Sequence, residues 1–171
     1  MRQLIRFVAS MAAIVMAATS VTLAFGTHVA AADDTASATG ANVVPLSSIL
    51  RRCDWTSAPY VPSDNKGSGY AIISRNRDTV TADVHMLAVV PDIWYGVRLV
   101  QVPRPGISCA AGDPGVGVGR LYTDGAGNGS VIVSAPVMDG ATGAWVSVEG
   151  PLGTSIMLSG DFRTSDYVAK I

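Results

Sequence analysis

Apolar and polar residues alternate along much of the chain, and a period of two predicts β-strands. The clearest segment is Thr79 to Ala88, where valine, alanine and methionine occupy the even positions and polar residues the odd ones as far as His85. Pro91 and Asp92 then predict a turn into Trp94 to Val102, where Tyr95, Val97 and Leu99 alternate with Gly96 and Arg98. We expect these two segments to be neighbouring antiparallel strands.

Shorter alternating runs predict the remaining strands. They are Gly69 to Ser74, Val116 to Thr123, Ser130 to Ala135, Trp145 to Glu149, Ser155 to Ser159 and Tyr167 to Ile171. A short helix is expected at one place, Asn42 to Arg52. The inward positions predict a core of Val80, Val84, Met86, Leu99, Leu121, Val131, Val133, Val146 and Val148.

Turn residues punctuate these runs. The Asn128-Gly129 pair within Asp124 to Gly129 predicts a hairpin loop, because both residues tolerate positive φ. A calcium loop is the alternative, but Ala126 and Ala135 stand where oxygen ligands are required. Gly115, Gly117 and Gly119 alternate with valines, which favours a strand with one small-residue face over a phosphate loop.

Composition supports an all-β class. The chain has 18 Gly and 9 Pro, a single Glu and two Lys, so strong helix formers are scarce and turn signals frequent. We therefore predict a single antiparallel β-sandwich of the immunoglobulin-like or Greek-key kind over residues 43–171, with a small closed β-barrel as the alternative. Residues 33–42, rich in Ala, Thr and Asp, read as a flexible lead-in.

The N-terminus has the profile of an export signal. Arg2 and Arg6 precede a run from Phe7 to Ala32 that has no charged side chain and ends in three alanines. We expect cleavage after Ala32, which would make residues 1–32 a signal peptide; an uncleaved membrane anchor is the alternative. The exported chain would be secreted or held in the cell envelope.

Charge and cysteine content narrow the functional classes. Without Arg2 and Arg6 the chain has ten of its 12 basic side chains against 13 acidic ones, and this acidic excess disfavours nucleic-acid binding. The only two cysteines, Cys53 and Cys109, are predicted to form a disulfide, as an even count in an exported chain favours.

Candidate catalytic chemistry is sparse. After loss of His28, His85 is the only histidine, so one chain offers no site built on several imidazoles, and we predict no metal and no cofactor. A hydrolase that uses His85 or a pair of carboxylates is the enzymatic alternative, although the chain has no Gly-x-Ser-x-Gly motif and Glu149 is its only Glu. A solvated His85 beside Asp83 on the polar face of a strand is the structural alternative.

Aromatic residues supply a possible binding surface. Trp94 and Tyr95 fall on opposite faces of one strand, so one of them should point away from the core. Tyr60, Trp94 and His85 are the residues expected to form a binding surface, because rigid aromatic rings contribute strongly to contact energy.

Two family resemblances accompany these patterns. The segments Trp94 to Leu99 and Leu121 to Gly127, with Cys109, resemble small secreted actinobacterial proteins, mycobacterial ones in particular, mostly of unknown function. The strand pattern alone is similar to Greek-key sandwiches of the Cu/Zn superoxide dismutase type, but the histidine ligands of that activity are absent. We expect a non-enzymatic binding or envelope-associated protein whose partner is an envelope lipid, a glycan or a protein.

Overall fold

The computed structural model describes residues 40–58, 66–152 and 160–171, and these residues form an antiparallel all-β domain. The predicted fold class is confirmed. The strands are β1 (Asn42–Ser47), β2 (Ser68–Arg75), β3 (Thr79–Leu87), β4 (Trp94–Val102), β5 (Val116–Tyr122), β6 (Gly129–Pro136), β7 (Gly143–Gly150), β8 (Asp161–Ser165) and β9 (Ala169–Lys170).

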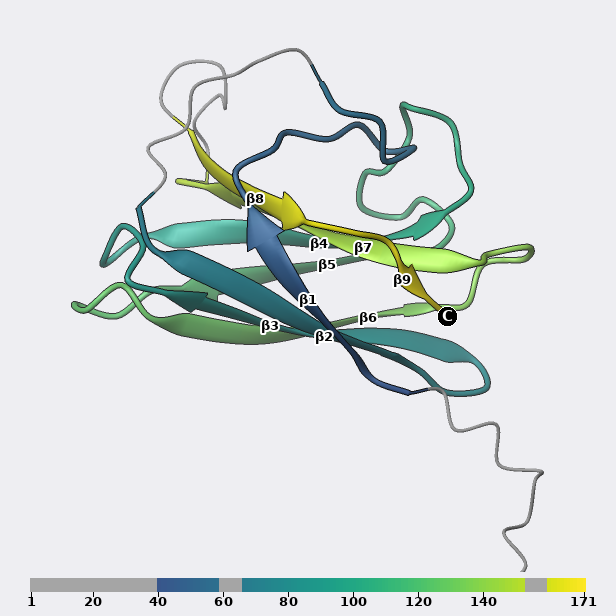
Figure 1. The fold of residues 1–171 in the computed structure, drawn as a ribbon, viewed down its shortest axis with the longest axis horizontal. Coiled ribbons are helices and arrows are strands. Elements are labelled where there is room, and N and C mark those ends of the chain that lie inside the picture. The colour runs from purple at the N-terminus through teal and green to yellow at the C-terminus, as the bar shows by residue number, and fades with distance from the viewer. Residues whose placement is uncertain (1–39, 59–65, 153–159) are drawn as a thin grey trace, which may run out of the picture. The chain divides into compact units, whose positions relative to one another are not determined.

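Eight strands form one continuous sheet in the order β5-β4-β7-β8-β1-β2-β3-β6, and β9 pairs separately with β7. Figure 1 shows this sheet folded into two layers, with β4, β5, β7 and β8 in one and β2, β3 and β6 in the other. Strand β1 joins the layers on one side. On the other side β5 and β6 lie together without a ladder, which leaves a nearly closed barrel with one unsealed seam.

The seam follows from the glycines of β5. A Cβ built on Gly117 would lie 2.6 Å from the Ser134 carbonyl oxygen of β6, and one built on Gly119 would lie 2.8 Å from Val133 Cγ2. Because glycine has no side chain, the backbone of β6 approaches the face of β5 directly. The small-residue face expected from the sequence is thus the surface on which the two layers meet.

The core between the layers matches the alternation of the sequence. Eight of the nine predicted core residues are at most 2% exposed, and the ninth, Val131, is partly buried. Tyr95 points inward at 0% exposure while Trp94 points outward at 50%, as their opposite faces require. For the strands that carry these core residues, period two therefore determined the inward face correctly.

A buried polar network lies at one end of this core. The Tyr95 hydroxyl donates to Asp161 Oδ2 at 2.9 Å, and Arg163 Nη1 donates to Asp161 Oδ1 at 2.8 Å. Arg163 also donates to Ser48 Oγ at 2.6 Å, so the network links β4 and β8 to the end of β1. Partners on both sides offset much of the cost of burying this ion pair.

Two predictions about elements were wrong. The helix expected at Asn42 to Arg52 is instead strand β1, which buries Val44 and Leu46 and pairs with β2 and β8. The ladders on both sides of β1 provide hydrogen-bond partners for more of its backbone N–H and C=O groups than an isolated short helix would.

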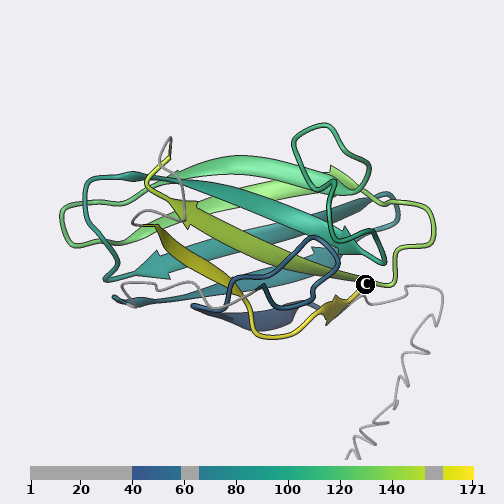
Figure 2. The ribbon, with the colours of Figure 1, turned by 90° about the horizontal axis from the view of Figure 1, so that it is seen from above.

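The segments Thr79 to Ala88 and Trp94 to Val102 are also not neighbours. Strand β3 pairs with β2 and β6, whereas β4 pairs with β5 and β7. Their connection crosses between the layers, with positive φ at Ala88 and Asp92, and the Val89 amide donates to the Gly127 carbonyl at 3.1 Å. The connection between β3 and β4 thus lies beside the β5–β6 turn at one end of the domain, and backbone hydrogen bonds join the two (Figure 2).

Three smaller differences concern the C-terminal strands and one turn. Strand β8 was not predicted, the strand expected at Tyr167 to Ile171 is reduced to β9, and the one expected at Ser155 to Ser159 lies outside the described residues. The hairpin expected around Asn128-Gly129 is instead a turn between two strands that form no ladder, β5 and β6, and its residue with positive φ is Gly127.

Candidate functional site

The outward face of β4, β5 and β7 carries the residues that surround the candidate site. In these strands Gly96 lies between Glu149 of β7 and Arg120 of β5, and Arg98 lies between Ser147 of β7 and Val118 of β5. Paired residues in adjacent strands project from the same face of the sheet. Glu149 and Arg120 therefore flank a position that has no side chain, and Arg98 and Ser147 project from the same face two residues along their strands.

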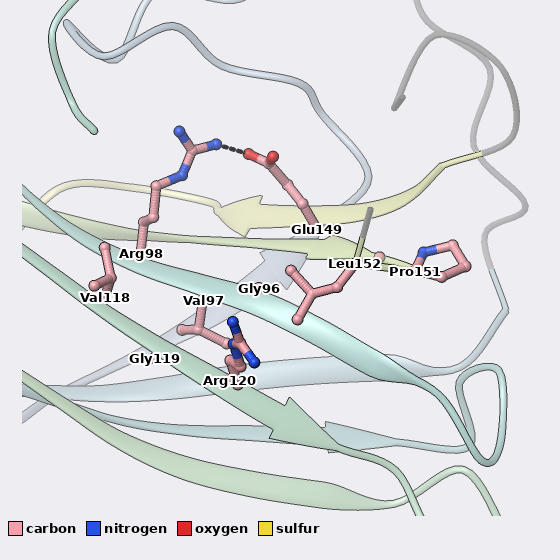
Figure 3. A pocket seen from close by; sticks show the side chains of 10 residues that line it. Gly96, Val97, Arg98, Val118, Gly119, Arg120, Glu149, Pro151 and Leu152 are labelled. Carbon is pink, nitrogen blue, oxygen red and sulfur yellow. Dashed lines mark hydrogen bonds and ion pairs between the residues drawn. The ribbon is translucent and has the colours of Figure 1, made fainter. Parts of the chain in front are cut away.

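A hollow of about 440 Å³ opens above Gly96 (Figure 3). Besides Gly96 it is lined by Val97, Arg98, Val118, Gly119, Arg120, Glu149, Gly150, Pro151 and Leu152. The Leu152 side chain leans over the floor, since a Cβ built on Gly96 would lie 3.0 Å from Leu152 Cδ2. The volume falls within the range of small-molecule sites.

The hollow continues toward Trp94. An adjoining depression shares Arg120, Pro151 and Leu152 and adds Ile93 and Trp94. The Trp94 ring is half exposed and contacts the Tyr122 ring at 5.1 Å between centroids, with a tilt of 52°. Aromatic surface therefore extends the site at the edge nearest Arg120.

Charges in the hollow are unequally satisfied. Arg98 Nη2 forms an ion pair with Glu149 Oε1, which also accepts a hydrogen bond from Ser147 Oγ at 2.7 Å. Arg120 is exposed, and its guanidinium forms no hydrogen bond or ion pair with any residue that the structure describes. Figure 3 shows Arg98 and Glu149 joined, with Arg120 apart from them. Within the part of the chain that the structure describes, one positive charge in the hollow is thus left without a counterion.

A disulfide-linked pair of loops covers the same face beside the hollow. Cys53 and Cys109 are bonded with their Cα atoms 5.6 Å apart, which confirms the predicted disulfide. Trp55 packs edge-on against Trp145 of β7 at 5.7 Å, and the Arg51 guanidinium lies 3.5 Å from the Trp55 ring centroid. These contacts bury Trp145 to 2% exposure and give the covered part of the face a small apolar core of its own.

Two of the three residues predicted as a binding surface, Trp94 and His85, lie on different layers. Trp94 lies at the edge of the hollow, whereas His85 projects from β3 in the other layer, and Tyr60 lies outside the described residues. His85 Nε2 is 3.0 Å from Asp83 Oδ1, and its ring stacks on Tyr70 at 4.7 Å. The side chains of His85 and Asp83 are 29% and 39% exposed, as expected for an open, solvated strand face.

Sequence reasoning missed Arg98, Arg120 and Leu152 as site residues and treated Glu149 only as an exposed strand residue. A signal existed for Arg98, since it shares the outward side of its strand with Gly96 and Trp94. Nothing in the sequence aligned β5 and β7 with that strand.

Metal binding finds no support where the structure describes the chain. No cluster of three or more His, Cys, Asp or Glu side chains occurs within residues 40–58, 66–152 and 160–171. Asp124 Oδ1, the first oxygen of the alternative calcium loop, instead accepts the amides of Ala126 and Asn128, both at 2.9 Å. None of the described residues belongs to a helix long and apolar enough to cross a membrane.

No protein-family model matches the sequence, and comparison with curated proteins and with solved structures finds no match. Function is therefore inferred from the geometry of the hollow.

Proposed function

We propose that this chain is an exported, non-enzymatic binding protein that holds a small ligand in the hollow above Gly96. The observation that carries the proposal is a concave site built on three paired strands, with apolar walls and an arginine that has no partner among the described residues. Sites on strands are preformed, so a ligand would not have to order them. The disulfide is in keeping with an oxidising compartment outside the cytoplasm.

The arrangement of polar groups favours binding over catalysis. Glu149 Oε1 is already engaged by Arg98 and Ser147, so both contacts would have to be rearranged before this oxygen could reach a reacting group. His85, the residue on which a hydrolase would depend, lies on the opposite layer and does not line the hollow. In this proposal, the envelope lipid, glycan or protein partner expected from the sequence binds in the hollow.

The test uses the secreted, oxidised protein and a filled-hollow variant. Gly96→Val places a side chain on the floor at a position with ordinary strand geometry, so the fold should persist. Both proteins are incubated with glycan and lipid fractions of a mycobacterial envelope, and retained molecules are identified by native mass spectrometry. The wild type should retain a ligand stoichiometrically, and Gly96→Val should lose it.

Two controls make the result specific. Ser130→Val adds the same kind of side chain to an exposed strand position of the other layer and should retain the ligand. Equal retention by wild type and Gly96→Val would refute the hollow as the site. Turnover of any component that disappears in His85→Ala would establish the hydrolase instead.

A further inference from the structure

We propose that the ligand of the hollow is an acidic sugar, with its anionic group on Arg120 and its ring against Trp94. This inference rests on the proposed function and specifies the chemistry of the same site. It combines three features of the described residues: the unpaired cation, the exposed aromatic ring beside it, and the polar pair on the far side of Gly96.

The charge of the site selects an anion. Arg98 and Glu149 neutralise each other, so Arg120 sets the net charge of the hollow at one positive unit. A guanidinium matches a carboxylate or a phosphate oxygen pair in geometry as well as charge. The exported chain carries an excess of acidic residues, so an anion is repelled by most of the surface and attracted to the positive charge of the hollow.

The distribution of apolar and polar groups selects a sugar over a hydrocarbon chain. The Trp94 ring is 50% exposed beside Arg120, and rings of this kind pack against flat, partly apolar surfaces. Arg98 and Glu149 keep 34% and 22% of their side chains exposed, so they offer a donor and an acceptor to hydroxyl groups.

The measurement is a titration of the secreted protein followed by the tryptophan indole signals in ¹H–¹⁵N spectra. The probes are sodium glucuronate, glucose 6-phosphate, glucose, inorganic phosphate, acetate and decanoate, at constant ionic strength. Trp94 should respond to the two acidic sugars, while Trp145, which is 2% exposed, and Trp55 serve as internal references. Glucose, phosphate and acetate should bind at least about tenfold more weakly, because each offers only part of the contacts.

Variants separate the contributions. Arg120→Gln should weaken glucuronate binding about tenfold or more and abolish the preference for glucuronate over glucose, as expected from loss of a charge-assisted pair. Arg77→Gln removes the same charge from an exposed turn between β2 and β3 and should change neither. Trp94→Ala should weaken glucuronate and glucose by similar factors.

Several outcomes would overturn the inference. Absence of any response to glucuronate and glucose 6-phosphate at tens of millimolar would do so, as would decanoate binding more tightly than either. If Arg120→Gln binds glucuronate like the wild type while Gly96→Val loses its envelope ligand, the acidic-sugar assignment fails and the proposed binding function stands. Inorganic phosphate binding as tightly as glucose 6-phosphate would reduce the site to a simple anion site.

Discussion

At the scale of single residues, the candidate site depends on Gly96, whose missing side chain leaves space, and on Arg120, whose charge the neighbouring side chains do not neutralise. Gly96 leaves open the space between Glu149 and Arg120, and Leu152 covers only part of it. Arg98 and Glu149 neutralise each other as an ion pair, which leaves the charge of Arg120 available to a ligand. The hollow therefore depends on one absent side chain and one unmatched charge.

Tyr95 carries the clearest prediction at this scale, concerning stability in alkaline solution. Burial, followed by the neighbouring Asp161 carboxylate and the hydrogen bond to it, raises the pKa of Tyr95 well above its ordinary value of about 10. A raised folded-state pKa means that the unfolded chain releases this proton first. The contribution of Tyr95 to the free energy of unfolding should thus be constant below about pH 10 and fall above it, by about 1.4 kcal/mol per pH unit.

Urea denaturation of wild type and Tyr95→Phe between pH 8 and 11 measures this difference. The variant should be less stable at pH 8, by about 1–3 kcal/mol, because Asp161 loses a donor in a buried site. It should also lose the additional alkaline fall. Tyr167→Phe retains Tyr95 and should keep that fall; equal slopes in wild type and Tyr95→Phe would contradict the prediction.

At the scale of elements, the seam between β5 and β6 depends on close backbone approach. Gly117→Val should lower the free energy of unfolding by about 1–3 kcal/mol, since its Cβ would collide with the Ser134 carbonyl oxygen, which belongs to a strand. Gly125→Ala, at a turn position where a Cβ meets nothing within 4 Å, is the control and should change stability little. Chemical denaturation of both variants gives the comparison, and similar values for the two would show that β6 can move away.

The disulfide-linked loops are a second element whose role can be measured. Cys53 and Cys109 are separated by 56 residues, and in the chain-entropy treatment closing a loop of this length stabilises the fold by about 4 kcal/mol. The double variant Cys53→Ser with Cys109→Ser should lose up to that amount in urea denaturation. Exposure of Trp145 should accompany the loss, visible as a red shift in fluorescence, because Trp55 would no longer be held against it. An unchanged midpoint would show that the apolar contacts suffice.

At the scale of the whole molecule, the path of the chain through the sheet places the candidate site and His85 on different layers. Three consecutive strands, β4 to β6, are followed by β7, which returns to lie beside β4. This return brings Glu149 to Gly96 and Arg98 and so completes the hollow. The same path carries β3 into the opposite layer, which separates His85 from the charges of the site.

Export is the prediction that concerns the whole chain. Secretion should remove residues 1–32, and intact mass together with N-terminal sequencing of the protein recovered outside the cells should give Asp33 as the first residue. Cleavage there leaves the chain ahead of β1 intact, so the domain should be unaffected. A full-length product retained with the membrane would instead identify the anchor.

Local sequence identified the described strands other than β1 and β8, and it determined which way the alternating ones face. Alternation in Thr79 to Ala88 and in Trp94 to Val102 requires one buried and one open face whatever the partners are, so the core and the orientation of Trp94 followed directly. The disulfide followed from arithmetic, because two cysteines allow one intramolecular pairing.

Only the tertiary structure decided which strands are neighbours. A period of two is satisfied equally by a hairpin and by a crossing between layers, so β3 and β4 were wrongly expected to pair, and β1 became a strand because β2 and β8 offer it ladders. The hollow was invisible for the same reason. Gly96, Arg120 and Glu149 belong to three strands far apart in sequence, and only the long-range register of β7-β4-β5 aligns them.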